Sequence, residues 1–224
     1  MDNIVIVSCT QKSESEFKKT PLGQSLEKVM NTASLPITTC IFYSNTEGLC
    51  KQYNKAIRAH TKDDEKSIMV FIHDDVFIED SYFTEKLVMY LKRYHIVGVA
   101  GSMKWALRHP TVWHNVKCEW SGTVPHKLDG KYIVTKYGEY LQKCVVMDGM
   151  FLAVKTETFK KTNLRFDERL LFHHYDIDFC LTAKKLGLKQ TTIPLWLVHC
   201  SEGRWQDDPV WHQSEKVMLK KWAT

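Results

Sequence analysis

The chain has 224 residues, of which 44% are hydrophobic and 25% are charged, and its formal net charge is +5. These values are typical of a soluble globular protein, and they exclude a disordered chain, a coiled coil and a collagen-like stalk. The length predicts a single domain over residues 1–224. A modest positive charge without a long basic run favours anionic small ligands over nucleic acid.

Short apolar runs alternate with helical patterns in the first hundred residues. The predicted elements are, in chain order, a strand at 4–7, a helix that opens at Pro21 with apolar positions at Leu22, Leu26, Val29 and Met30, a strand at 37–43, a helix at 49–60, a strand at 67–72, a helix at 81–93 and a strand at 96–100. This alternation predicts an α/β fold with a mostly parallel sheet and right-handed crossovers.

The second half of the chain is harder to interpret. The pattern dissolves between Ser102 and Lys143, which predicts a long loop region or a meander of short strands. The elements predicted after it are a strand at 145–154 interrupted by Asp148–Gly149, a helix at 176–186, a strand at 191–198, and a terminal helix striped by Trp211, Glu215, Met218 and Trp222.

The seven cysteines form no C-x-x-C pair, which argues against a zinc ribbon or a dithiol redox site. Several lie inside apolar runs, as buried free thiols do in a reducing compartment. The chain has no signal-peptide core, and no run approaches the roughly 20 apolar residues of a membrane span. These features predict a cytoplasmic protein.

Polar clusters follow four predicted strands: Ser8-Cys9-Thr10, Ser44-Asn45, His73-Asp74-Asp75, and His199-Cys200-Ser201. Ligands of open α/β sheets bind beyond the carboxyl ends of the parallel strands, so these clusters indicate a ligand site. An acidic pair directly after a buried strand has two explanations. It either caps a turn, or it binds a divalent cation, because Mg²⁺ and Mn²⁺ prefer oxygen ligands.

A second acidic pair, Asp176 and Asp178, lies in the first turn of a predicted helix. Carboxylates there complement the helix dipole. Because residues two apart do not share a helix face, one carboxylate can point into a cleft while the other caps or forms an ion pair. The chain lacks the motifs of P-loop, dinucleotide-binding, zincin and serine-hydrolase proteins.

Taken together, these segments resemble the family 2-type glycosyltransferases of the GT-A fold. The matching segments are Ile4–Val7, Tyr53-Asn54, the DxD-like Phe71–Val76, Gly98–Gly101, Met147–Val154, Phe166–Asp178, Leu186-Gly187, Ile193-Pro194 and Val198–Ser201. The resemblance implies a Rossmann-like, mostly parallel central sheet flanked by helices. Residues 1–101 would form a nucleotide-binding half and residues 102–224 an acceptor and catalytic half.

The resemblance also implies an inverting transfer of a sugar from a nucleoside-diphospho donor, with UDP expected, to a hydroxyl of a glycan or lipid-linked acceptor in polysaccharide assembly. Asp75 and His199 would bind Mn²⁺ or Mg²⁺. Asp176 aligns with the aspartate of the family's Glu-Asp motif and would be the general base, with Asp178 as the alternative. The implied donor-binding residues are Thr10, Asn45, Asn54, Asp74, Asp148 and Gly149.

Three positions depart from the family pattern. Tyr175 stands where the Glu-Asp motif usually has Glu, so the orienting partner of the base is open. Asn45 stands where many relatives carry an acid that reads the base of the nucleotide. His73-Asp74-Asp75 is not a strict DxD, which weakens the case for metal dependence.

Several alternatives remain open at this point. His199 is either a metal ligand or a histidine satisfied by hydrogen bonds, and a non-catalytic nucleotide- or sugar-binding module is the alternative to an enzyme. The paired lysines are solvated faces or a loose contact with the anionic inner face of a membrane. The tryptophans of the 105–120 segment, with Trp205 and Trp211, either stack on acceptor sugars or anchor the core and loops.

Overall fold

The computed structural model describes residues 3–62, 66–106, 112–114, 116–201 and 209–223. Two six-stranded sheets form its centre. The strands of the first sheet, in order across it, are β11 (Gln190–Thr192), β5 (Ile96–Gly98), β10 (Phe151–Lys155), β3 (Ser67–Ile72), β1 (Asn3–Cys9) and β2 (Ile37–Phe42).

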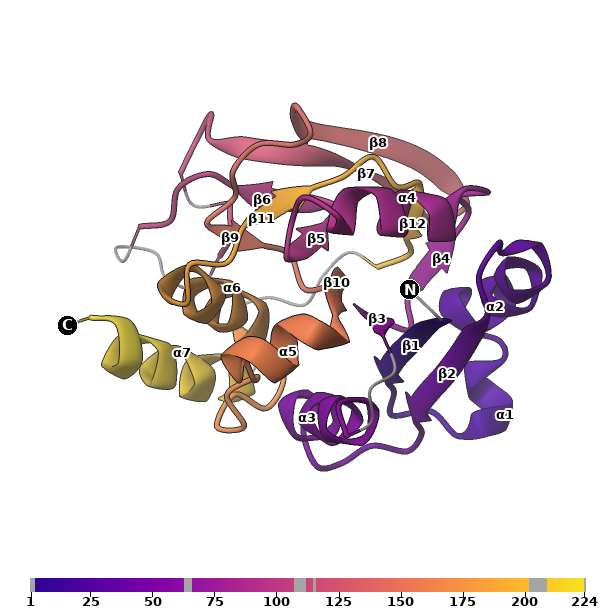
Figure 1. Cartoon of the computed structure of the whole chain (residues 1–224), viewed down its shortest axis with the longest axis horizontal. Coiled ribbons are helices and arrows are strands. Elements are labelled where there is room, and N and C mark those ends of the chain that lie inside the picture. The colour runs from indigo at the N-terminus through magenta and orange to yellow at the C-terminus, as the bar shows by residue number, and fades with distance from the viewer. Residues whose placement is uncertain (1–2, 63–65, 107–111, 115, 202–208, 224) are drawn as a thin grey trace.

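The first sheet is mostly parallel, as predicted. β1 is parallel to both β2 and β3, and β11 is parallel to β5, whereas β10 is antiparallel to both of its neighbours. Every residue of β3 is buried, because the sheet is covered on both faces. Figure 1 shows α3 and α5 on one side of this sheet, and α4 with the second sheet on the other.

Helices α2, α3, α4, α6 and α7 correspond to predicted helices, whereas α1 and α5 were not predicted. Their bounds are α1 (Glu14–Phe17), α2 (Pro21–Thr32), α3 (Leu49–His60), α4 (Phe83–Leu91), α5 (Thr156–Thr162), α6 (Tyr175–Lys185) and α7 (Pro209–Trp222). α3 has the predicted bounds, and α2 begins at Pro21 because the Thr20 hydroxyl caps the amide of Gly23. Of the four apolar positions noted in this helix, Leu22, Leu26 and Val29 are buried, whereas Met30 is 45% exposed.

The second sheet contains, in order, β4 (Val76–Ile78), β12 (Leu197–His199), β7 (Trp120–Leu128), β6 (Ala100–Ser102) and β9 (Val146–Met147), and β8 (Lys131–Gly138) pairs with β7. Three predicted strands are split between the sheets. The run 96–100 divides into β5 and β6, the run 145–154 into β9 and β10, and the run 191–198 into β11 and β12. Both sheets bury these segments, so hydrophobicity alone does not mark the crossing point.

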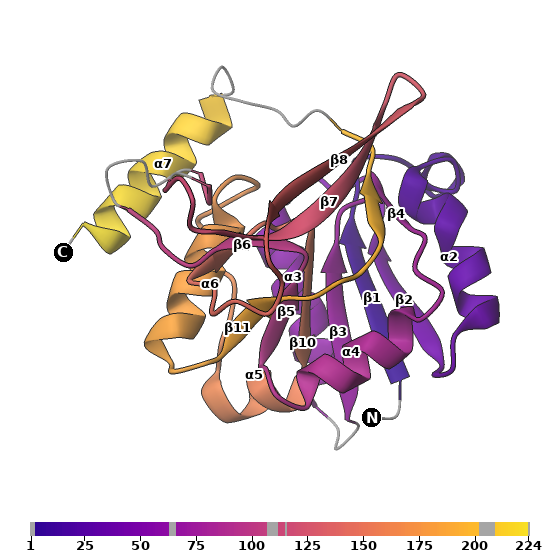
Figure 2. The same ribbon diagram turned by 90° about the horizontal axis from the view of Figure 1, so that it is seen from above.

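The prediction of a loop or short strands over 102–143 was right only in part: the described residues 103–106, 112–114 and 116–119 are in no helix or strand, but the strands that follow are long. β7 and β8 form a long antiparallel hairpin, which Figure 2 shows rising beyond the rest of the second sheet. Its turn is Asp129-Gly130, and both residues have positive φ, as a tight hairpin turn requires. β8 is mostly exposed, and apolar alternation is therefore weak there.

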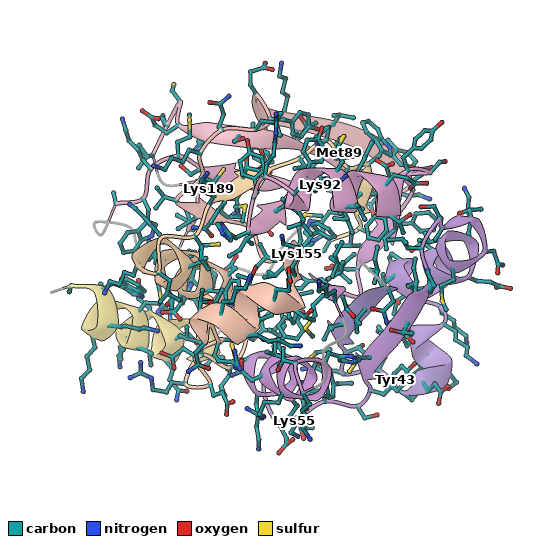
Figure 3. The ribbon with its side chains drawn as sticks, viewed as in Figure 1. Tyr43, Lys55, Met89, Lys92, Lys155 and Lys189 are labelled. Atoms are coloured by element: carbon teal, nitrogen blue, oxygen red, sulfur yellow. The ribbon has the colours of Figure 1, made fainter. Side chains whose placement is uncertain are left out.

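The two ends of the strands in the first sheet differ in chemistry. The parallel strands β1, β2 and β3 end beside the polar clusters of the sequence. Lys92, Lys155 and Lys189 lie at the opposite end of the sheet, where β5 and β11 begin and β10 ends. Figure 3 shows these three lysines on one face of the molecule. The candidate site therefore lies at the carboxyl ends of β1 and β3.

Candidate active site

The loops after β1, β2 and β3 meet through hydrogen bonds. The Thr10 hydroxyl donates to Asp74 Oδ2 at 2.6 Å, and the backbone N–H of Asn45 donates to the backbone carbonyl of Thr10 at 2.8 Å. The Asn45 side-chain oxygen accepts from Gln52 Nε2 at 3.0 Å. Three of the predicted donor-binding residues thus lie together at the carboxyl edge of the first sheet.

Asp75 and His199 face each other across the edge of the second sheet. β12 is antiparallel to β4 with His199 opposite Val76, which brings His199 Nε2 within 3.5 Å of Asp75 Oδ2. Burial would raise the pKa of Asp75, but the hydrogen bond and charge of His199 lower it to about 2. Burial would lower the pKa of His199, but the bond to Asp75 raises it.

The Asp75–His199 pair fits a divalent cation. Asp75 Oδ1 is buried and has no hydrogen-bond partner among the described residues, so a ligand-binding oxygen is left over. The described residues offer no group of three His, Cys, Asp or Glu side chains arranged around one cation. Two protein ligands are nevertheless sufficient when substrate phosphates and water complete the set, as is common for Mg²⁺.

A cavity of about 180 Å³ lies beside the first turn of α6. Two carboxylates, Asp148 and Asp176, line it together with Gly149. The rest of its lining is largely aromatic, comprising His73, Val112, Trp113, His114, Phe172, His173, His174, Tyr175, Ile177 and Trp211. The cavity therefore combines carboxylates with flat apolar faces, which is a chemistry suited to sugars.

Asp176 lines this cavity, and it is held by two backbone amides. Gly149 N–H donates to its Oδ2 at 2.8 Å, and Ile177 N–H donates to its Oδ1 at 2.9 Å. Burial and the charge of Asp148 raise the pKa of Asp176 to about 7, although these two amides oppose the rise. A carboxyl group with this pKa can take up a proton near neutral pH.

Asp148 is fixed by an aromatic neighbour that the sequence did not single out as its partner. Trp113 Nε1 donates to Asp148 Oδ2 at 2.6 Å, and Met150 N–H donates to Asp148 Oδ1 at 2.8 Å. Trp113 and Trp211 are only 7% and 9% exposed, yet both line the cavity. They serve as anchors and as cavity walls at once. Trp205 lies outside the described residues.

Asp178 is not in the cavity, so we exclude it as the alternative base. Its carboxylate is fully buried, forms an ion pair with Lys221 at 2.7 Å, and accepts from Trp222 Nε1 at 2.9 Å. The two aspartates of α6 thus point to different places: Asp176 to the cavity, and Asp178 to the contact between α6 and α7.

We predict that Lys221→Met lowers the free energy of unfolding by about 3 kcal/mol at pH 7.5, because it leaves a buried carboxylate without its cation. Urea denaturation measures this change. The matched control is Lys220→Met, an exposed neighbour on the same helix, which should stay within about 0.5 kcal/mol of the wild type. Equal stability of the two variants would show that the ion pair does not hold α7.

Asn54 is also placed differently from its prediction. Its side chain is buried, donates to the Phe166 carbonyl and to Glu168 Oε1, each at 2.9 Å, and accepts from Phe166 N–H at 3.0 Å. All of its hydrogen-bonding groups are engaged within the protein. We therefore assign Asn54 to holding the loop before α6 rather than to donor binding.

The sequence matches the model of a glycosyltransferase-like family over residues 8–222. The chain belongs to this family. The transferase has no match among curated protein sequences. Within the residues that the structure describes, no helix has the length and apolar character needed to cross a bilayer.

Solved structures similar to the transferase confirm the predicted GT-A fold. The catalytic domain of Drosophila β1,4-galactosyltransferase 7, complexed with xylobiose, is 11% identical with a TM-score of 0.58, covering 96% of this chain and 80% of that one. GalNAc-T7 with UDP, GalNAc and Mn²⁺ is 10% identical with a TM-score of 0.63, covering 99% of this chain. The transferase spans only 48% of the length of GalNAc-T7.

A third structure is a mutant of the same Drosophila enzyme with manganese, UDP-Gal and xylobiose, at 10% identity and a TM-score of 0.54, covering 93% of this chain and 78% of that one. At such identities the likeness shows the fold alone. Family membership, together with this fold, makes the chain an enzyme that transfers sugars.

Proposed function

We propose that the transferase moves a sugar from a nucleoside-diphospho donor, with UDP expected, to a hydroxyl group of a glycan or lipid-linked acceptor, with inversion at the anomeric carbon. The observation that carries this proposal is Asp176. Its carboxylate lines an aromatic cavity, is aimed by two amide N–H groups, and has a pKa of about 7. Those are the properties of a general base.

In this mechanism the acceptor hydroxyl oxygen attacks the anomeric carbon while the bond from that carbon to the donor phosphate oxygen breaks. Asp176 accepts the hydroxyl proton, and the electron pair of the broken bond leaves on the diphosphate. Attack from the face opposite the leaving group inverts the anomeric centre. A divalent cation held by Asp75 and His199 would neutralise the charge that develops on the diphosphate.

The donor is assigned to the side of the site where Thr10, Asn45 and Asp74 meet. His73, which precedes Asp74, lines the cavity that contains Asp176, so the donor-side loop and the proposed base share one cavity wall. UDP and Mn²⁺ occur together in the GalNAc-T7 structure. This supports UDP as the donor nucleotide and a divalent metal here.

The acceptor is assigned to the aromatic part of the cavity. Trp113 and Trp211 line the same cavity as Asp176, and aromatic faces stack on the apolar faces of sugar rings. The Drosophila galactosyltransferase was solved with xylobiose. Both observations favour a glycan as the acceptor.

A cytoplasmic location remains part of the proposal. All seven cysteines are free thiols, three of them buried, which is the pattern of a reducing compartment. Polysaccharide assembly and contact with the inner face of a membrane remain predictions from the sequence.

The experiment that tests the donor class is calorimetric titration of the purified transferase with UDP, GDP and CDP, each with and without Mn²⁺. We expect Mn²⁺-dependent binding of UDP. Tighter binding of GDP or CDP would mean that the donor carries that nucleotide instead of UDP. Equal binding with and without Mn²⁺ would mean that the metal has no part in donor binding. Failure to bind any of the three would refute the proposed function.

The pKa of Asp176 predicts the pH dependence of transfer. The base must be ionised, so kcat/KM should be independent of pH well above 7 and should fall about tenfold per pH unit below it. Initial rates between pH 5.5 and 9 measure this profile. UDP affinity, measured over the same range at constant Mn²⁺, is the control that separates protonation of Asp176 from protonation of His199. A flat profile for kcat at saturating donor would contradict the assignment of Asp176.

A further inference from the structure

Tyr175 immediately precedes the proposed base and is buried. Its hydroxyl makes two hydrogen bonds, one with the Gly149 carbonyl at 2.8 Å and one with His73 Nε2 at 2.7 Å. A carbonyl oxygen can only accept, so the single hydroxyl hydrogen goes to Gly149. His73 Nε2 must therefore carry a hydrogen and donate it to the tyrosine oxygen. The two contacts fix the tautomer of His73.

These bonds continue to the base without a break. Gly149, whose carbonyl accepts from Tyr175, donates its own N–H to Asp176 Oδ2 at 2.8 Å. The backbone N–H of His73 donates to the Met150 carbonyl at 3.1 Å. The loop that contains Gly149 is thus held between the end of β3 and the first turn of α6.

The backbone of Gly149 is tightly packed, and there is no room for a side chain at this position. A Cβ atom at this position would lie 2.4 Å from the Tyr175 hydroxyl oxygen and 2.9 Å from Asp176 Cβ. The peptide therefore packs directly against both residues, and a shift of the tyrosine oxygen would be transmitted to the amide that aims the carboxylate.

We propose that Tyr175 and His73 are positioning residues that hold the Gly149 loop and so orient the Asp176 carboxylate for proton transfer. This inference rests on the proposed function. It also explains the departure from the Glu-Asp motif: a neutral hydroxyl supplies an orienting contact at the place where relatives carry a carboxylate. His73 links this contact to the loop of Asp74 and Asp75, so both sides of the site depend on one network.

A purely structural role for Tyr175 is the competing explanation, because its ring packs against Tyr53 and Phe166 at centroid distances of 6.0 and 5.9 Å. Tyr175→Phe separates the two roles, since it keeps the ring and removes only the hydroxyl. We expect kcat to fall about 10- to 30-fold while UDP affinity and donor KM change less than twofold. The acid limb of the pH profile should move to higher pH, because a loosened Gly149 N–H stabilises the ionised base less.

The control is Tyr90→Phe. It removes a hydroxyl from a tyrosine of α4 that packs against the core and does not line the cavity. This variant should retain the wild-type kcat and pH profile. Equal losses in the two variants would mean that the enzyme is sensitive to any lost tyrosine hydroxyl, and would overturn the positioning role.

Variants of His73 test the other end of the network. His73→Gln can place an amide N–H near the Nε2 position and should retain most of the activity, whereas His73→Leu should resemble Tyr175→Phe. The double variant of His73→Leu and Tyr175→Phe should be little worse than either single variant, because both break the same connection. Wild-type kcat and pH profile in both His73→Leu and Tyr175→Phe would refute the proposal.

Nitrogen-15 NMR of the His73 imidazole gives a readout that does not depend on catalysis. The wild type should show the Nε2–H tautomer, and Tyr175→Phe should lose this preference. An Nδ1–H tautomer in the wild type would overturn the network. If the tautomer is as expected but Asp176→Asn remains active, the network exists and the proposed function fails instead.

Discussion

Asp176→Asn should lower kcat by about 10³-fold, within the range that a general base contributes. An amide cannot take the acceptor proton, but it has nearly the size of the carboxylate, and its oxygen can still accept from the Gly149 N–H. UDP affinity in the presence of Mn²⁺ should therefore be unchanged. Single-turnover transfer assays and calorimetry, performed on the same preparation, measure the two quantities.

The control for this variant is Asp178→Asn, two residues along the same helix. Asp178 is bound to Lys221 and Trp222 and does not line the cavity. This control should lose stability while keeping kcat per folded molecule. Transfer by Asp176→Asn at near the wild-type rate would remove Asp176 from the mechanism.

Asp75→Ala should weaken Mn²⁺-dependent UDP binding by more than about 100-fold, because even outer-shell substitutions cost a metal site 10- to 100-fold in affinity. The variant removes the carboxylate that has a buried, unpartnered oxygen next to His199. Calorimetric titration with UDP at fixed Mn²⁺ measures the effect, and manganese EPR reports the metal directly.

Titration of the same two proteins with UDP alone is the control. Asp75 would act through the metal, so wild type and Asp75→Ala should then bind UDP with similar affinity. If Mn²⁺ strengthens UDP binding equally in both proteins, the metal is held elsewhere, and the Asp75–His199 pair is an ion pair of structural importance only.

The sequence was most informative where the hydrophobic pattern of a buried strand or an amphipathic helix lies within a single element. β1, β3 and α3 were predicted because their apolar periodicity begins and ends within one element. The boundary between β5 and β6 could not be found in this way, since Val99 is as buried as its neighbours. The β7–β8 hairpin did leave a signal, the Asp129-Gly130 turn, which the exposed and weakly patterned β8 obscured.

The site residues also differ in whether the sequence near them could predict their surroundings. The resemblance to a family pointed to Asp75, His199 and Asp176, at positions where the structure offers chemistry suited to their proposed roles. The separate surroundings of Asp176 and Asp178 could not be predicted, because the partner of Asp178 is Lys221, 43 residues away on another helix. The bond between Trp113 and Asp148 is non-local in the same way, and no periodic pattern encodes it.

Helix α7 contacts the rest of the protein at two separate points, and this affects which substitutions could alter substrate preference. Trp211 at its start lines the cavity, while Lys221 and Trp222 near its end bind Asp178. Ten residues of helix place these points about 15 Å apart. Because Lys221 and Trp222 do not line the cavity, a substitution at Trp211 would change the cavity wall while leaving the contacts with Asp178 in place. If the acceptor binds there as proposed, a change of acceptor preference at Trp211 would carry a cost in stability, because this tryptophan is itself buried.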